Sequence, residues 1–171
     1  MFFLTLAVIL FTIMSAVSAL PTPCSSSTTP TPTDVVSGDS VQIHWNFDVD
    51  TCLTVDGPAA NGTPVVLRAC DVDPIPAQHW KINFGDTKVQ LADSNFCLDA
   101  GLTPANGVQL KIWECYDGLA AQAWHYTDDF RISLKDQGYC VDLQGGIAVD
   151  NHKVQSWQCR DENPNQVWTH I

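Results

Sequence analysis

The sequence predicts an all-β domain built from three copies of one structural unit. The motif Gln-x-Trp occurs three times, ending at Trp80, Trp124 and Trp168, so that successive copies are 44 residues apart. Six of the seven cysteines stand ahead of these motifs in three pairs of nearly equal spacing. No stretch after the N-terminal segment follows the 3.6-residue period of a helix. Repeats of this kind, made of short strands and turns, indicate pseudo-threefold symmetry.

The cysteine spacing predicts one disulfide in each repeat. Six cysteines can pair in fifteen ways, but the intervals here are 18, 18 and 19 residues, which favours three local bridges. The predicted pairs are Cys52–Cys70, Cys97–Cys115 and Cys140–Cys159. In the chain-entropy model each bridge stabilises the fold by ~3 kcal/mol. Cys24 is left over, and a free thiol, an intermolecular bridge and a removed propeptide all fit it.

Turn formers and strands lie between the two cysteines of each repeat. The turn dipeptides are Asn61-Gly62, Asn106-Gly107 and Asp150-Asn151. The apolar and alternating residues that follow them predict strands over 65–67, 108–113 and 154–157. Each repeat is therefore expected to contain a hairpin closed by its disulfide.

The N-terminal segment predicts export from the cell. Residues 1–19 carry no charge and end in small residues, which indicates a cleaved secretory signal peptide. A membrane anchor is the alternative, but the apolar stretch over 2–17 is short for a span of ~20 residues. Residues 20–39 are rich in Ser, Thr and Pro and predict an extended tail that is compatible with O-glycosylation. The folded domain is expected over 40–171, and the mature protein is expected to be secreted.

The formal net charge of −11 argues against phosphate-bearing partners. Such a chain repels nucleic acid and anionic membrane surfaces, whereas a neutral ligand is compatible with it. None of the common catalytic or cofactor motifs occurs, and the five histidines lack metal-ligand spacing. We therefore expect no enzymatic activity, no cofactor, no metal and no membrane insertion.

Three Gln-x-Trp repeats in register with three cysteine pairs resemble the ricin-B lectins. This resemblance covers about residues 40–171 and implies a β-trefoil that binds carbohydrate. It also implies that Trp80, Trp124 and Trp168 are core residues and that the motif glutamines tie backbone turns together. Trp45, on an apparent strand ahead of the first cysteine, is expected in the core as well.

The third repeat carries every residue that the resemblance implies for a sugar site. The set is Asp142, Gln155, Trp157, Asn165 and Gln166. A flat indole ring covers the C–H face of a pyranose, while a carboxylate and amides bond its hydroxyl groups. We expect the main binding site here.

The second repeat predicts a weaker or altered site. Asp99, Trp113 and Gln122 are in place, but Lys111 replaces the first glutamine and Ala121 replaces the asparagine. Lysine still donates hydrogen bonds to hydroxyl groups, whereas alanine cannot form any.

The first repeat is expected to have a structural role only. Thr54 stands where the acid should be, Val66 replaces the glutamine, Arg68 the aromatic residue and Ala77 the asparagine. Asp56 lies two residues beyond the acidic position, which moves it ~6.6 Å along a strand.

The resemblance leaves several questions of function open. It suggests galactose or N-acetylgalactosamine, although some members bind xylan or other sugars. A protein-binding trefoil, such as a protease inhibitor, and a degenerate lectin scaffold are the alternative functions. The expected partners are glycans or glycoproteins, and the expected state is a monomer or a dimer linked through Cys24.

One N-glycosylation sequon, Asn61-Gly62-Thr63, falls in a predicted surface turn. Pro64 follows it and is expected to lower occupancy. By its place in the sequence, a glycan on Asn61 is expected at the repeat that binding needs least.

Overall fold

The computed structural model describes residues 39–72 and 75–170, which form short strands and four single-turn 3-10 helices. The predicted signal peptide and Cys24, like almost all of the predicted tail, lie outside these residues. Within the described ranges, no helix is long and apolar enough to cross a membrane. The strands are β1 (Ile43–Trp45), β2 (Thr51–Val55), β3 (Val65–Ala69), β4 (Trp80–Lys81), β5 (Gly85–Thr87), β6 (Gln90–Leu91), β7 (Phe96–Asp99), β8 (Val108–Gln109), β9 (Lys111–Glu114), β10 (Trp124–Tyr126), β11 (Ile132–Leu134), β12 (Tyr139–Leu143), β13 (His152–Gln158) and β14 (Trp168–His170). The 3-10 helices are η1 (Pro76–Gln78), η2 (Ala120–Gln122), η3 (Gln144–Gly146) and η4 (Pro164–Gln166).

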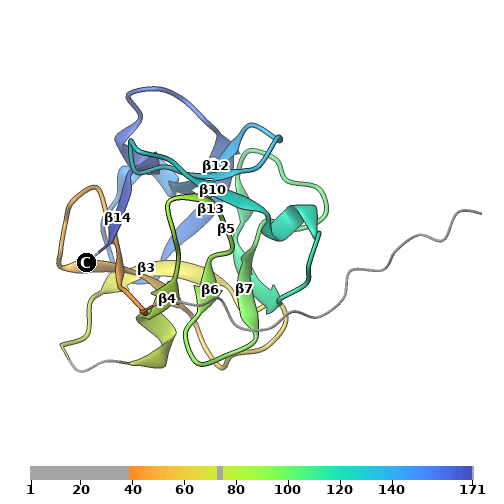
Figure 1. The fold of residues 1–171 in the computed structure, drawn as a ribbon. Coiled ribbons are helices and arrows are strands. Elements are labelled where there is room, and N and C mark those ends of the chain that lie inside the picture. The colour runs from red at the N-terminus through yellow and green to blue at the C-terminus, as the bar shows by residue number, and fades with distance from the viewer. Residues whose placement is uncertain (1–38, 73–74, 171) are drawn as a thin grey trace, which may run out of the picture.

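One set of strands closes into a barrel (Figure 1). β14 pairs with β1, β4 with β6, β5 with β10, and β10 with β11, all antiparallel. A bridge between Val41 and Trp80 joins the start of β1 to β4. The bond from the Trp168 amide to the Phe130 carbonyl, 2.7 Å long, joins the segment before β11 to β14. The ring therefore has no open edge at the point where the last repeat meets the first.

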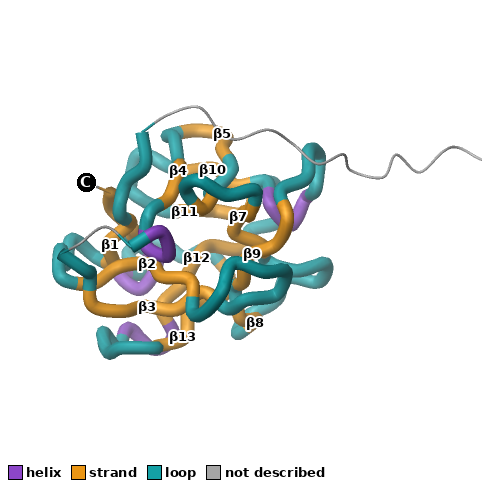
Figure 2. The backbone as a smooth tube through the Cα atoms, turned by 90° about the horizontal axis from the view of Figure 1, so that it is seen from below, coloured by secondary structure: helices purple, strands orange, loops and turns teal. Residues whose placement is uncertain are grey.

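Each repeat adds one hairpin to this barrel, and the three hairpins meet one another. The hairpins are β2–β3, β7–β9 and β12–β13. β13 pairs with both β3 and β8, and Pro64 bridges Lys111, so every hairpin contacts the other two. Figure 2 shows the strands wrapped around one centre, with the loops and short helices outside.

The disulfides form as the spacing predicts. Cys52–Cys70, Cys97–Cys115 and Cys140–Cys159 each close one hairpin. The all-β fold, the threefold repeat and the single bridge per repeat are therefore confirmed. The strand predicted over 108–113 is divided, because the chain changes partner there: β8 pairs with β13 and β9 pairs with β7.

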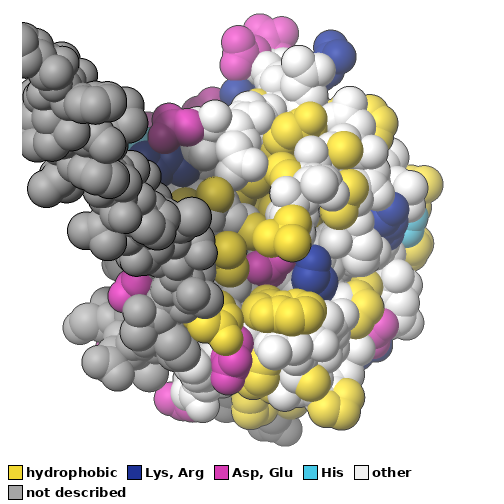
Figure 3. Space-filling model, turned by 90° about the vertical axis from the view of Figure 1, so that its right-hand side faces the viewer, with side chains coloured by type: hydrophobic (Ala, Val, Ile, Leu, Met, Phe, Trp, Pro, Cys, Tyr) yellow, Lys and Arg dark blue, Asp and Glu magenta, His cyan; other side chains and the backbone are white. Residues whose placement is uncertain are grey.

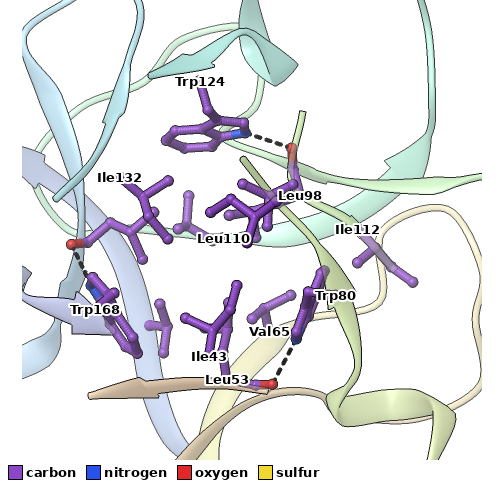
Figure 4. Close-up of a cluster of buried hydrophobic side chains, with 14 of the residues drawn as sticks. Ile43, Leu53, Val65, Trp80, Leu98, Leu110, Ile112, Trp124, Ile132 and Trp168 are labelled. Carbon is purple, nitrogen blue, oxygen red and sulfur yellow. Dashed lines mark hydrogen bonds between the residues drawn. The ribbon is translucent and has the colours of Figure 1, made fainter. Parts of the chain in front are cut away.

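The core is centred on the three motif tryptophans, as expected (Figure 4). Trp80, Trp124 and Trp168 are at most 1% exposed, and each ring removes about 150–250 Å² from water. Trp45 lies at the edge of this core, partly buried against it.

Candidate functional site

The strand register brings the predicted site residues together in each hairpin. In the third repeat Asp142 lies opposite Gln155, and Cys140 lies opposite Trp157. Since side chains two apart on a strand point to the same face, the carboxylate, the amide and the ring share one face. The corresponding pairs in the other repeats are Asp99 with Lys111, Cys97 with Trp113, Thr54 with Val66, and Cys52 with Arg68.

The Gln-x-Trp motif holds the strand that carries the acidic residue. The Trp168 indole donates to the carbonyl of Val141, directly before Asp142, across 2.9 Å. The Gln166 amide donates to Asp142 itself, across 3.2 Å, and to the carbonyl of Gln158. The other two repeats have the same arrangement. The indole nitrogens of Trp80 and Trp124 donate to the carbonyls of Leu53 and Leu98, each across 2.9 Å. The amides of Gln78 and Gln122 donate to the side chains of Thr54 and Asp99, each across 3.1 Å.

Gln166 therefore positions Asp142 and presents no free donor of its own. Its side chain is completely buried, its nitrogen donates twice, and its oxygen accepts from the Arg160 amide at 3.0 Å. Gln122 is bonded in the same way, with its oxygen accepting from the Tyr116 amide at 2.9 Å. Both motif glutamines position a carboxylate and have no donor left for a sugar.

In the third site, which we define as Asp142, Gln155, Trp157, Asn165 and Gln166, Asp142 is the central group. It is 3% exposed, and Gln155 donates to its Oδ1 across 2.9 Å. The Oε1 oxygen of Gln155 is buried and has no hydrogen-bond partner among the described residues. Trp157 lies beside this pair and is partly exposed. A polar ligand at this face would meet the aromatic ring and the edge of the Asp142 carboxylate, with the buried amide of Gln155 behind them.

Asp142 is a buried carboxylate whose hydrogen-bond partners are neutral. In the described part of the chain it forms no ion pair, and its partners are all neutral amides. Burial raises the pKa of Asp142 above its ordinary value, and the donated hydrogen bonds offset part of that rise. Holding a charge in such a place opposes folding, which is typical of groups kept for function.

Asn163 and Asn165 make different contacts near Asp142, and only Asn163 bonds its carboxylate. Asn163 donates to Oδ2 of Asp142 at 3.4 Å, and its own oxygen accepts from the Asn165 amide at 3.1 Å. The Asn165 side chain instead lies against Gly146 of η3, where an added Cβ would clash with Oδ1. Sequence reasoning named Asn165 and missed Asn163. The sequence signal that could have identified Asn163 is the Asn163-Pro164 pair, because Asn-Pro commonly starts a turn.

In the second site, which we define as Asp99, Lys111, Trp113 and Gln122, a cation replaces the amide. The Lys111 ammonium lies 3.4 Å from Oδ1 of Asp99 and 5.8 Å from the centre of the Trp113 ring. Asp99 is 4% exposed and Trp113 is 37% exposed. The lysine neutralises the carboxylate and offers only donors, so this site favours acceptor oxygens on a ligand.

A pocket of about 490 Å³ lies at the second site. Beyond Asp99, Lys111 and Trp113, its lining consists of Gly101, Leu102, Tyr116 and Leu119. Figure 3 shows the face on which this repeat lies, where hydrophobic side chains gather around a few charged ones. The apolar lining was not anticipated from the sequence, since Leu102, Tyr116 and Leu119 come from loops outside the repeated motif.

The first repeat has no carboxylate at the corresponding position. Thr54 is completely buried and accepts from Gln78, so it fills the place of the acid in the structural network. Arg68, in the aromatic position, forms an ion pair with Asp56 and donates to Asn151. The carboxylate of Asp56 is therefore paired with Arg68, the residue that replaces the aromatic ring.

The turn of each repeat caps the hairpin of the next repeat. Oδ1 of Asn61 accepts from the Glu114 amide, and Oδ1 of Asn106 accepts from the Gln158 amide, both at 2.7 Å. Oδ1 of Asp150 accepts from the Ala69 amide at 2.7 Å, which closes the cycle. Asn61 belongs to the first repeat by sequence, but its turn lies against the second hairpin, where Oδ1 of Asn61 bonds the amide of Glu114 and a Cβ at Gly62 would lie 3.8 Å from the Trp113 ring.

The fold and the residue pattern place the chain among lectins of the trefoil type. A family model described as the ricin-type beta-trefoil lectin domain matches residues 39–168, and the chain belongs to this family. This membership supports carbohydrate binding. No curated protein matches the chain.

Solved structures share the fold at low sequence identity. The designed threefold-symmetric protein ThreeFoil has a TM-score of 0.67 at 18% identity, covering 77% of this chain and 97% of its own. The Macrolepiota procera ricin B-like lectin, solved with lactose, has a TM-score of 0.63 at 24% identity, with 81% and 98% covered. The Abrus precatorius agglutinin has a TM-score of 0.63 at 21% identity and covers 81% of this chain, which spans about half (51%) of the agglutinin chain.

Proposed function

We propose that this protein is a secreted lectin whose principal site is the third site and whose ligand is a galactose or N-acetylgalactosamine unit of a glycan. The observation that carries the proposal is the buried carboxylate of Asp142, which no cation of the described residues neutralises and which three neutral amides hold in place. Such a group binds a neutral polyol well, because hydroxyl groups donate to it without adding charge. The proposal includes binding only and no catalysis.

The ring of Trp157 supplies the apolar half of the interaction. It projects from the same strand and the same face as Gln155. A pyranose is polar at its rim and has a C–H patch on one face, and galactose has a large patch because its axial 4-hydroxyl points to the other side. Stacking this patch on the indole would leave the rim hydroxyl groups next to Asp142 and Gln155.

The second site is proposed to bind the same class of ligand more weakly. Lys111 competes for Asp99, and Ala121 offers no side-chain hydrogen bond. A single shallow site is expected to bind a monosaccharide with a dissociation constant on the order of 0.1–1 mM. Two sites in different repeats would allow one protein molecule to bind a branched or clustered glycan at two points, which increases its avidity.

Secretion is supported by the three disulfides, which persist in oxidising compartments. The acidic net charge of −11 is compatible with a neutral glycan as partner. A monomer with two unequal sites needs no second subunit to cross-link glycans, whereas a protein with one working site would need a dimer, for which Cys24 is the candidate link.

The test is a titration of the refolded domain with galactose, N-acetylgalactosamine and xylobiose, followed by tryptophan fluorescence. Saturable quenching by one sugar whose tighter phase is lost in Asp142→Ala, leaving at most the weaker response of the second site, supports the proposal. The matched control is Asp56→Ala in the first repeat, which should leave binding unchanged. Binding that survives Asp142→Ala would move the principal site elsewhere. No response to any sugar at concentrations far above the expected dissociation constant would favour a protein-binding trefoil.

A further inference from the structure

The sequon turn of the first repeat lies against the binding residues of the second site. Gly62 donates from its amide to the carbonyl of Ile112, directly before Trp113, at 2.9 Å. A Cβ at Gly62 would lie 3.8 Å from Cζ3 of the Trp113 ring. Asn61 accepts from the Glu114 amide, directly after Trp113. The turn is thus bonded to the backbone on both sides of this tryptophan.

Asn61 is exposed and has the sequon required for attachment of a glycan. The hydrogen bond to Glu114 uses only its Oδ1, while glycosylation takes place at Nδ2. In that reaction Nδ2 displaces the diphosphate of a lipid-linked oligosaccharide at the anomeric carbon. The C–O bond breaks, the N–C bond forms and Nδ2 loses one proton. Modification therefore leaves the cap on Glu114 intact and is compatible with the fold.

We infer that Asn61 carries an N-linked glycan, in the reduced fraction of chains that Pro64 allows, and that this glycan covers Trp113 and restricts access to the second site. This inference rests on the proposed lectin function. Asn61 bonds the residue directly after Trp113, and Gly62 bonds the residue directly before it, so a glycan on Asn61 would start within one residue of this ring. A soluble ligand must then displace this glycan before it can stack on the ring.

The third site is not restricted in this way. Its equivalent turn residue, Asn106, accepts from the Gln158 amide next to Trp157, in the same geometry as Asn61 next to Trp113. The tripeptide there is Asn106-Gly107-Val108, which is not a sequon. Glycosylation would therefore leave one site open and the other controlled by its own carbohydrate.

The experiment uses the full chain expressed in a eukaryotic secretory host, with the occupancy of Asn61 measured by peptide mass mapping. Thr63→Ala removes the sequon, and Thr63→Ser is the matched control that keeps both sequon and hydroxyl. The first readout is collisional quenching of tryptophan fluorescence by acrylamide. The glycosylated protein should show less quenching than Thr63→Ala, and the difference should vanish when Trp113→Phe is added to both.

The second readout is lactose affinity in an Asp142→Ala background, where only the second site can respond. Removing the glycan should tighten lactose binding about tenfold, the worth of one aromatic stacking contact. Val108→Thr, which creates a sequon at Asn106, should transfer the same protection to Trp157.

Absence of a glycan on Asn61, or a glycan that leaves acrylamide quenching of Trp113 unchanged, would overturn the inference. Failure of the lectin proposal would be distinguishable, because the chain with Asp142 intact would then bind no sugar at all. The acrylamide measurement still tests coverage in that case, because it needs no ligand.

Discussion

Gln166 donates to Asp142 across 3.2 Å, and both side chains are buried. The same glutamine donates to the carbonyl of Gln158, so it joins the two strands of the third hairpin as well as the acidic group. On the proposed function, one residue would thus serve folding and binding together. The equivalent bond in the first repeat, from Gln78 to Thr54, serves folding alone. This difference between equivalent positions allows the two roles to be measured separately.

Gln166→Ala should lower both stability and sugar affinity. It removes the side-chain donor from the Gln158 carbonyl and one of three donors from Asp142, and it leaves the Arg160 amide without its acceptor, at an expected cost of about 1–3 kcal/mol in the free energy of unfolding. Gln78→Ala should have a similar effect on stability with no change in sugar affinity. Chemical denaturation and sugar titration of both variants provide the check. Equal effects of both on sugar affinity would show that the glutamine acts only through general stability.

Asp142→Asn should abolish binding at the third site while leaving the domain as stable as before or more stable. The ionised carboxylate is buried without a cation, and the neutral amide removes that cost. Rotation of the Gln155 amide would let its unpartnered oxygen accept from the new asparagine. Thermal unfolding at neutral pH, measured with and without sugar, tests the expectation. A marked loss of stability would indicate that the carboxylate is a structural element.

Sugar affinity at the third site should fall as the solution is acidified. Burial raises the pKa of Asp142, so its carboxylate takes up a proton at a higher pH than an ordinary aspartate does. Because the folded pKa is raised, the folded state binds the proton more tightly than the unfolded state. Ionisation of this group therefore lowers stability as pH rises through the interval between the two pKa values. Affinity and stability should change in opposite directions there, and titrations over a pH series test this. Affinity that does not vary with pH would exclude the ionised carboxylate as an essential acceptor.

Gly146→Ala should weaken the third site by displacing Asn165. The glycine has a φ of +64°, which disfavours a side chain, and an added Cβ would clash with the Asn165 amide. We expect sugar affinity to fall by about tenfold, equivalent to the loss of one good hydrogen bond. Gly138→Ala is the control, since it also has a positive φ but nothing within 4 Å of the new Cβ. Isothermal titration of both variants with the sugar that binds wild type would distinguish local crowding from backbone strain.

Lys111→Gln should strengthen binding of neutral sugar at the second site. It removes the ammonium that lies 3.4 Å from Asp99 and restores the residue type found opposite Asp142. The measurement is a titration in the Asp142→Ala background, with Lys111→Met as the control that removes the charge without adding an amide. A gain with methionine as large as that with glutamine would assign the effect to charge alone.

Much of the fold follows from the sequence because its signals are repeated. The disulfides and the core tryptophans occur at matching intervals, and the structure confirms the all-β, threefold arrangement that they predict. The division of the predicted strand at Leu110 was not foreseeable, because it depends on which neighbour each half meets. Leu110 is fully buried, and its amide bonds to Val154 of another repeat.

The candidate sites were only partly predictable. The repeated offsets locate Asp142, Gln155 and Trp157, because the strand register converts them into neighbours. Asn163 and the apolar walls of the second pocket lie on loops, where sequence separation gives no measure of distance. The packing of the Asn61-Gly62 turn against Trp113 and Glu114 is likewise a contact between repeats, which sequence separation alone does not reveal.

The cyclic capping of one hairpin by the turn of the preceding repeat has a consequence for how this domain can be divided. The edge of the second site comes from the first repeat, and the edge of the third site comes from the second. A single repeat excised from the chain would contain an acid, a ring and a disulfide but would lack its border. The smallest intact candidate site therefore spans a boundary between repeats, and the first repeat, which lacks the acid, amide and aromatic residues of the other two, still supplies part of the border of the second site.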